Sequence, residues 1–314
     1  MGLQHMMMTL ALCGALTAHA KAPTWPALTT PTSTLPLGRN DAAVVVAVER
    51  PRHLPRIEGA ARNGADWRVW LTRDLGLSPG KVRLLVNADA TREKILAAVE
   101  AAAAAVDVGG RVWFVFIGHG APDEDTGDGL LLGADTGPDQ RSFVERGVTR
   151  DEVLQRLGAT RGEAVVVIDA CFTGKTPEGE AALPGASIRS ANIVVEPMKA
   201  RARMHLFSPR RRVTGPLPGA PRPAYSYLVL GALRGWADED HDGAITASEV
   251  DGFIGASVTI AVYSRTPGNL YAGDGTAVLA RYTGGHPDVP AMMAELHPAP
   301  PLVTTTTTTS TPGP

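Results

Sequence analysis

The stretch EAVVVIDACFTG, residues 163–174, is an apolar run that ends in an acid, a cysteine and a glycine. Such a run is typical of a strand buried on both faces of a parallel sheet. Similar runs are DAAVVVAVE (41–49), KVRLLVN (81–87) and RVWFVFIGHG (111–120), and weaker ones are ANIVVEP (191–197) and MHLFSP (204–209).

Segments of helical pattern separate these strands. Apolar residues recur at near-helical spacing from residue 57 to Gly76, and Thr91 can cap an alanine-rich helix that begins after it. Thr149 with Glu152 forms a capping-box pattern, and residues 224–237 read as an apolar helix. Strands that alternate with helices predict an α/β fold, with a mostly parallel sheet covered on both faces.

Composition limits the classes of function. The chain has 314 residues, 44% of them hydrophobic and 20% charged, which suits one large domain or two small ones. The net charge is −2, and acids and bases are spread along the sequence. This charge pattern argues against a nucleic-acid partner.

The two ends differ in composition from the body. The apolar run 6–16 and Ala18-His19-Ala20 predict a signal peptide over 1–20, although a buried helix or a misassigned start are alternatives. Residues 21–39 read as a Pro/Thr-rich linker and 286–314 as a disordered Pro/Thr-rich tail. We therefore expect an exported chain, periplasmic or extracellular, with no membrane span after cleavage. Loss of Cys13 would leave Cys171 as the one thiol, which favours a chemical role.

Two strand ends carry chemistry. Ligands gather at the carboxyl ends of parallel strands, and there Gly118-His119-Gly120 and Asp169-Ala170-Cys171 follow the runs 111–117 and 163–168. An imidazole can take the thiol proton and make the sulfur a nucleophile. A lone cysteine is often a small buried residue and a Gly-His-Gly is often a turn, but the two together predict a Cys171–His119 pair.

At these residues the sequence resembles the caspase superfamily, and more closely its bacterial metacaspase-like branch. The resemblance rests on WFVFIGHGAPDEDTGDGLLLGAD and AVVVIDACFTG, and extends from about Asp41 to Tyr282. It implies a three-layer αβα sandwich with about six strands in a peptidase domain over residues 40–285. It also implies His119 as general base, Cys171 as nucleophile, and the N–H groups of Gly120 and Cys171 as oxyanion donors. Asp169 matches the acid of the primary specificity pocket, which implies protein substrates cleaved after Arg or Lys; the alternative for Asp169 is a cap on the turn that follows it.

The segment DEDHDGAITASE, residues 238–249, fits an EF-hand loop, and no organic cofactor is expected. A solvated acidic loop is the alternative to a structural or regulatory Ca²⁺ site. The expected ligands are Asp238, Asp240, Asp242, the Ala244 carbonyl, Thr246 and Glu249, around Gly243 and the apolar plug Ile245. The acids at 123, 124, 125 and 128 could form a second calcium site, although a solvated loop is the favoured interpretation.

The residue patterns and the resemblance together imply a cysteine endopeptidase of metacaspase-like type that acts through a thioester acyl-enzyme. Calcium could modulate it, and self-cleavage near Arg210-Arg211-Arg212 is a hypothesis set against a solvated basic loop. Two other functions stay open: a thiol acyl hydrolase or transferase of another specificity, and an inactive calcium-binding interaction module.

Overall fold

A six-stranded sheet forms the centre of the protein. The computed structural model describes residues 25–32, 35–123, 125–172, 203–209, 215–217, 219–261 and 269–283. Across the sheet the strands are ordered β10 (Asn269–Ala272), β8 (Met204–Pro209), β7 (Glu163–Asp169), β3 (Arg111–Ile117), β1 (Ala42–Ala47) and β2 (Val82–Val86). All neighbouring strands pair in parallel except β10, which is antiparallel to β8. The predicted mostly parallel sheet is confirmed.

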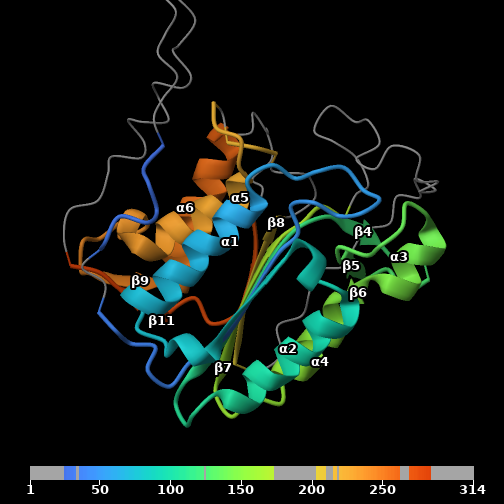
Figure 1. The fold of residues 1–314 in the computed structure, drawn as a ribbon. Helices are drawn as coiled ribbons and strands as arrows, with labels where there is room; N and C mark the ends of the chain where they lie inside the picture. Colours follow the sequence, from blue (N-terminus) through green and yellow to red (C-terminus); the bar gives the residue numbers. More distant parts are fainter. Residues whose placement is uncertain are drawn as a thin grey trace, which may run out of the picture.

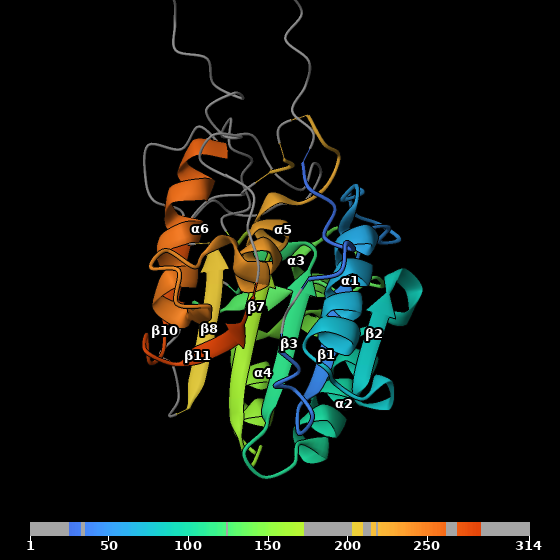
Figure 2. The same cartoon turned by 90° about the vertical axis from the view of Figure 1, so that its left-hand side faces the viewer.

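Helices cover both faces of this sheet and make a three-layer αβα sandwich (Figures 1 and 2). One face carries α1 (Ala60–Val69), α5 (Ala224–Gly231) and α6 (Ala247–Ala261), and α1 and α5 each continue into a π-helical turn, Trp70–Asp74 and Ala232–Trp236. The opposite face carries α2 (Arg92–Ala105) and α4 (Arg150–Leu157). The α/β class predicted from the sequence is therefore correct.

Successive side chains of each strand point to opposite faces of the sheet and so contribute to two hydrophobic cores. In β3, Trp113, Val115 and Ile117 pack toward α1 and α5, whereas Phe114 and Phe116 pack toward α2 and α4. A strand with helices on both sides must be apolar at every position, which is why these strands read as continuous apolar runs. The expected helix caps also form: the Thr91 hydroxyl accepts a hydrogen bond from Lys94 N, and Thr149 with Glu152 makes a complete capping box.

Several short elements are not predicted by the sequence pattern. They are the antiparallel strands β4 (Gly120–Pro122), β5 (Gly129–Leu131) and β6 (Val148–Thr149), helix α3 (Gln140–Arg146), the pair β9 (Ala244–Thr246) and β11 (Val278–Arg281), and the 3₁₀ turns Pro79–Lys81 and Asn87–Asp89. Strands of two to four residues carry too few side chains to show a period.

Some of the sequence predictions concern residues outside those that the structure describes. These are the signal peptide 1–20 with Cys13, part of the linker, the strand expected at 191–197, the basic segment 210–212 and the tail 286–314. Among the described residues, no helix combines the length and apolar character needed to cross a bilayer.

Candidate active site

The two strand ends that carry His119 and Cys171 lie next to each other. Strands β3 and β7 are neighbours, and their last paired residues are Ile117 and Asp169. His119 and Cys171 each follow two residues after that pair, at the same level of two strands about 5 Å apart. The Gly118 N–H donates to the Asp169 carbonyl at 3.1 Å, so the ladder holds beyond the strands. The predicted adjacency of the two ends is confirmed.

Both residues line one pocket of about 590 Å³. Its floor is the edge of the sheet, from Ile117 to Gly120 and from Asp169 to Cys171. Its walls come from residues 56–58, which follow β1, and from residues between Pro209 and Pro223 that the structure describes. Cys171 is half buried and is one of the residues that a ligand in this pocket would contact.

A backbone carbonyl orients the imidazole of His119. Its Nε2 lies 2.7 Å from the Pro55 carbonyl oxygen, which can only accept a hydrogen bond. Nε2 must therefore carry the proton in the neutral ring, and Nδ1 is left as the basic nitrogen. Burial lowers the pKa of His119 from its ordinary 6.5, and the Pro55 carbonyl opposes that shift only in part.

Sequence reasoning missed Pro55. A carbonyl oxygen has no side-chain signature, so no residue type at position 55 could have identified it. One topological signal was present: residue 55 follows β1, the strand beside β3, at the carboxyl edge where the pocket forms.

The N–H of Gly120 points away from the hairpin. Leu132 N donates to His119 O and Asp123 N donates to Asp128 O, so these residues form the hydrogen-bonded pairs of the β4–β5 ladder. In an antiparallel ladder such pairs alternate with non-hydrogen-bonded ones, and Gly120 with Leu131 is one of the latter. The Gly120 N–H therefore faces outward from β5, on the side open to other acceptors.

Asp169 has a structural partner that the sequence did not indicate. Its Oδ2 accepts the backbone N–H of Ser226 at 2.8 Å, in the first turn of α5, whose N-cap residue Pro223 offers no side-chain cap. The carboxylate is 8% exposed and also lines the pocket. A helix N-terminus is a favourable place for a carboxylate, so this contact joins Asp169 to the start of α5.

The other charges of the pocket leave it with acidic character. Arg56 donates to Glu49 Oε1 at 2.6 Å, and this ion pair offsets its positive charge. Glu58 and Asp169 are the acids among the lining residues. The described part of the pocket wall therefore suits a cationic side chain better than an anionic one.

The acids that follow His119 act as loop-forming groups. Asp123 accepts hydrogen bonds from Asp125 N and from both the N–H and hydroxyl of Thr126. Asp128 Oδ1 binds Arg150 Nε at 2.7 Å. These contacts occupy Asp123 and Asp128 with partners in the protein, which argues against a second calcium site, and the burial of Asp123 shows that the segment is not simply a solvated loop.

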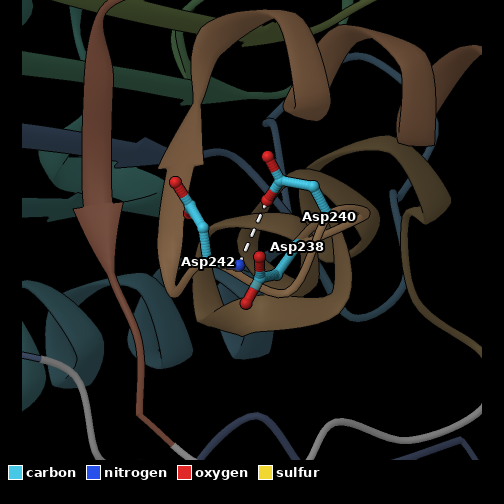
Figure 3. Close-up of side chains that lie close together, drawn as sticks. All are labelled: Asp238, Asp240 and Asp242. Atoms are coloured by element: carbon cyan, nitrogen blue, oxygen red, sulfur yellow. Dashed lines mark hydrogen bonds between the residues drawn. The ribbon is translucent and has the colours of Figure 1, made fainter.

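The EF-hand-like loop brings three of its expected ligands together. Carboxylate oxygens of Asp238, Asp240 and Asp242 lie within 4.8 Å of one another (Figure 3). Two oxygens that share a Ca²⁺ ion at about 2.4 Å can be at most about 5 Å apart, so this donor set fits the ion. Gly243 has the positive φ of 77° that the turn in such loops requires.

The remaining expected ligands make contacts within the loop and its neighbouring strand, and Glu249 Oε1 also accepts the N–H of Glu239, between the first two aspartates, at 3.3 Å. Glu249 Oε2 accepts hydrogen bonds from the N–H and the hydroxyl of Thr246, both at 2.7 Å, and so caps helix α6. Ala244 opens strand β9, which pairs with β11, and Ile245 is fully buried as the predicted plug.

No family model and no curated protein sequence matches the chain. Among solved structures it is similar to a Geobacter sulfurreducens protein, with 17% identity and a TM-score of 0.45 over 81% of this chain and 96% of the other. It is also similar to caspase-1 of Spodoptera frugiperda, with 14% identity and a TM-score of 0.45 over 75% and 84% of the two chains. The Drosophila initiator caspase Dronc gives 9% identity and a TM-score of 0.46 over 85% and 89%. These likenesses are too distant to assign an activity, which must come from the residues of the site itself.

Proposed function

We propose that the chain is a caspase-like cysteine endopeptidase, of metacaspase-like type, that hydrolyses peptide bonds after Arg or Lys. One observation carries this proposal: His119 and Cys171 lie at the same level of adjacent strands in one pocket, and the Pro55 carbonyl fixes the imidazole with Nδ1 as its base. This pair of groups is what thiol-based acyl transfer requires.

In the proposed reaction, Nδ1 of His119 takes the proton of the Cys171 thiol as the sulfur attacks the scissile carbonyl carbon. The carbonyl oxygen becomes an oxyanion, to which the N–H groups of Gly120 and Cys171 would donate. The C–N bond then breaks, the imidazolium protonates the leaving amine, and a thioester remains. Water, deprotonated by His119, attacks the thioester and releases the carboxylic acid and the thiol.

Preference for Arg or Lys follows from the charges of the pocket. A cationic side chain that enters it would meet Asp169, whose charge the helix α5 terminus stabilises, and Glu58 near the opening. The ion pair of Arg56 with Glu49 reduces the repulsion that Arg56 would exert. An anionic substrate residue would be repelled by the same groups.

We also propose that the loop 238–249 binds Ca²⁺ through Asp238, Asp240 and Asp242, with the Ala244 carbonyl, Thr246 and Glu249 as further ligands. The spacing of the aspartate oxygens and the backbone turn at Gly243 support this. Glu249 would have to turn from its capping contact with Thr246 toward the ion. The ion would offset two of the negative charges that the three aspartates place next to one another, and so stabilise the start of α6.

The test is hydrolysis of fluorogenic peptides that end in Arg, Lys or Asp, measured with Ca²⁺ and with a chelator, for the wild type and Cys171→Ala. We expect Arg and Lys peptides to be cleaved and the variant to lose about 10³-fold or more in rate. Equal activity of the variant would refute the Cys171–His119 mechanism, and preference for Asp would refute the role of Asp169. Hydrolysis of esters or thioesters alone would favour the acyl hydrolase.

Self-processing is tested by the same pair of proteins. Cleavage after basic residues makes Arg210-Arg211-Arg212, which lie outside the described residues, candidate sites. A wild-type fragment pattern that maps to this segment and disappears in Cys171→Ala is the expected result on a denaturing gel. Identical bands for both proteins would exclude it.

A further inference from the structure

Phe172, the residue after the candidate nucleophile, points to the opposite side of the sheet from the pocket. Cys171 lines the pocket on the α5 side, whereas Phe172 is 7% exposed and belongs to the core under α2 and α4. The buried Phe172 ring therefore holds the backbone next to Cys171 against the core under α2 and α4.

The ring packs on the backbone of the histidine hairpin. A Cβ built on Gly120 would lie 2.9 Å from the Phe172 ring and 2.6 Å from the Cys171 carbonyl oxygen. A Cβ built on Gly129, across the hairpin in β5, would lie 2.7 Å from the same ring. Both positions must be glycine for the ring to lie this close, so the residue after the thiol is packed directly on the residue after the imidazole.

The ring also contacts a guanidinium that is held in an ion pair. The Arg150 guanidinium carbon lies 5.2 Å from the Phe172 ring centre, within the range of a cation–π contact. Arg150 is 4% exposed, and its Nε donates to Asp128 Oδ1 at 2.7 Å. Asp128 also accepts the N–H of Asp151 at 3.0 Å, so the guanidinium is fixed at the first turn of α4.

We propose that Phe172, held by Arg150 and Asp128, is a positioning residue that sets the location of the Cys171 thiol relative to His119. The inference rests on the proposed peptidase function. Because the ring touches the strand segments of both groups, a change in its volume would move one relative to the other. A displacement of about 1 Å in such a pair can cost about 100-fold in rate.

The first experiment compares Phe172→Leu with Phe114→Leu, the same substitution in the same core but in the middle of β3. Both variants should lose comparable thermal stability. Phe172→Leu should lower kcat for an Arg peptide by about 10- to 100-fold with KM changed less than about threefold. Phe114→Leu should keep both constants. A kcat loss of equal size in the two variants would overturn the positioning role, because it would then follow stability alone.

A second readout does not depend on peptide cleavage. The rate of Cys171 alkylation by iodoacetamide, followed by peptide mass from pH 5 to 9, reports how far His119 promotes the thiolate. We expect fast alkylation of the wild type near neutral pH, slow alkylation of His119→Ala, and a Phe172→Leu profile close to that of His119→Ala. If the wild type and His119→Ala react alike, the proposed function fails. If these two differ and Phe172→Leu follows the wild type, only the positioning role fails.

Two further variants test the packing itself. Gly129→Ala pushes a methyl against the ring and Arg150 Nε, so it should also lower kcat. The double variant with Phe172→Leu should lose no more kcat than the more impaired of the two single variants, because the methyl group occupies space that the ring has left. If the kcat loss of the double variant equals the product of the two single losses, the proposed contact between Gly129 and Phe172 is contradicted. Arg150→Lys keeps the charge but not the planar group, and an intermediate loss is expected; wild-type kinetics would remove Arg150 from the proposal.

Discussion

The two candidate sites of this protein are built in opposite ways. The acidic loop takes all of its expected ligands from twelve consecutive residues, and its aspartate and glutamate side chains accept hydrogen bonds from within the loop. The pocket at the sheet edge is assembled from the segment after β1, the ends of β3 and β7, the β4–β5 hairpin and the start of α5. For a site within one short segment, the sequence predicts both the ligands and their arrangement. For a site assembled from distant segments, the sequence predicts only the reactive side chains.

One helix joins the two sites. The α5 helix begins at the Asp169 carboxylate and continues through its π-helical turn to Trp236, two residues before the acidic loop. Arg234 in that turn forms a buried ion pair with Asp74 at 3.0 Å, which fixes the end of the helix near the loop. The four predictions that follow test whether the sites nonetheless respond separately.

The largest effect is expected at the assembled site. His119→Ala should lower peptide hydrolysis by about 10³-fold or more, because the base that activates the thiol is lost. The thermal midpoint should change little, since the side chain is only half buried at the pocket surface. Steady-state kinetics and thermal melts, each with and without Ca²⁺, measure the hydrolysis rate and the thermal midpoint. Residual activity above one tenth of the wild type would contradict the assignment of the base.

Two substitutions at Asp169 should distinguish the effect of its charge on specificity from its effect as a helix cap on stability. Asp169→Asn keeps an acceptor for the Ser226 N–H and should lower kcat/KM for Arg peptides by about 100-fold, at a stability cost of about 1 kcal/mol or less. Asp169→Ala should add about 1–3 kcal/mol of destabilisation, because the buried N–H then has no acceptor. Peptide panels and chemical denaturation give the two quantities. Unchanged Arg preference in Asp169→Asn would leave Asp169 as a cap alone.

The acidic loop should affect stability more than catalysis. Ca²⁺ at 100 times its Kd should stabilise the wild type by about 2.7 kcal/mol, a rise in Tm of several degrees for a domain of this size. Asp240→Asn should reduce that rise. Asp125→Asn, in the loop after His119, is the matched control and should preserve it. The same rise in wild type and Asp240→Asn would argue against binding at this loop.

The smallest effect concerns pH. The lowered pKa of His119 keeps its imidazole neutral at more acidic pH than usual, so kcat/KM should rise with pH through a value below 6.5 and be nearly flat above it. At pH 6.5 more than half of the maximal kcat/KM should remain. A midpoint of the acid limb above 6.5 would contradict the burial effect. Asp240→Asn should have the same profile.

The fold was largely predictable because its central strands are buried, and therefore apolar, at consecutive residues. The runs 42–47, 111–117 and 163–169 are apolar at nearly every position, which only a sheet covered on both faces explains. Strand β10 is half buried at the sheet edge, and β11 pairs only with the three-residue β9. Their pairing depends on tertiary contacts that leave no periodic pattern, so they were missed.

The candidate site was predictable only to the level of side-chain chemistry. His119 and Cys171 could be identified because each follows a strong apolar run. The Pro55 carbonyl and the contact of Gly129 with Phe172 could not, since both depend on distant segments that meet only in the folded chain. A capping role for Asp169 was expected only as an alternative and only for the turn that follows it; the cap of α5 could not be predicted for the same reason, since Ser226 is 57 residues away.

The contact between Asp169 and Ser226 constrains how this pocket could evolve. Under the proposed function, a lineage that came to cleave after acidic residues would have to discard the Asp169 carboxylate, and only a replacement such as Asn would keep an acceptor for the Ser226 N–H. A replacement without an acceptor, such as Ala, would produce a less stable protein unless a cap at position 223 arose first. The same order applies to a designer who replaces Asp169 by such a residue: Pro223 before Asp169.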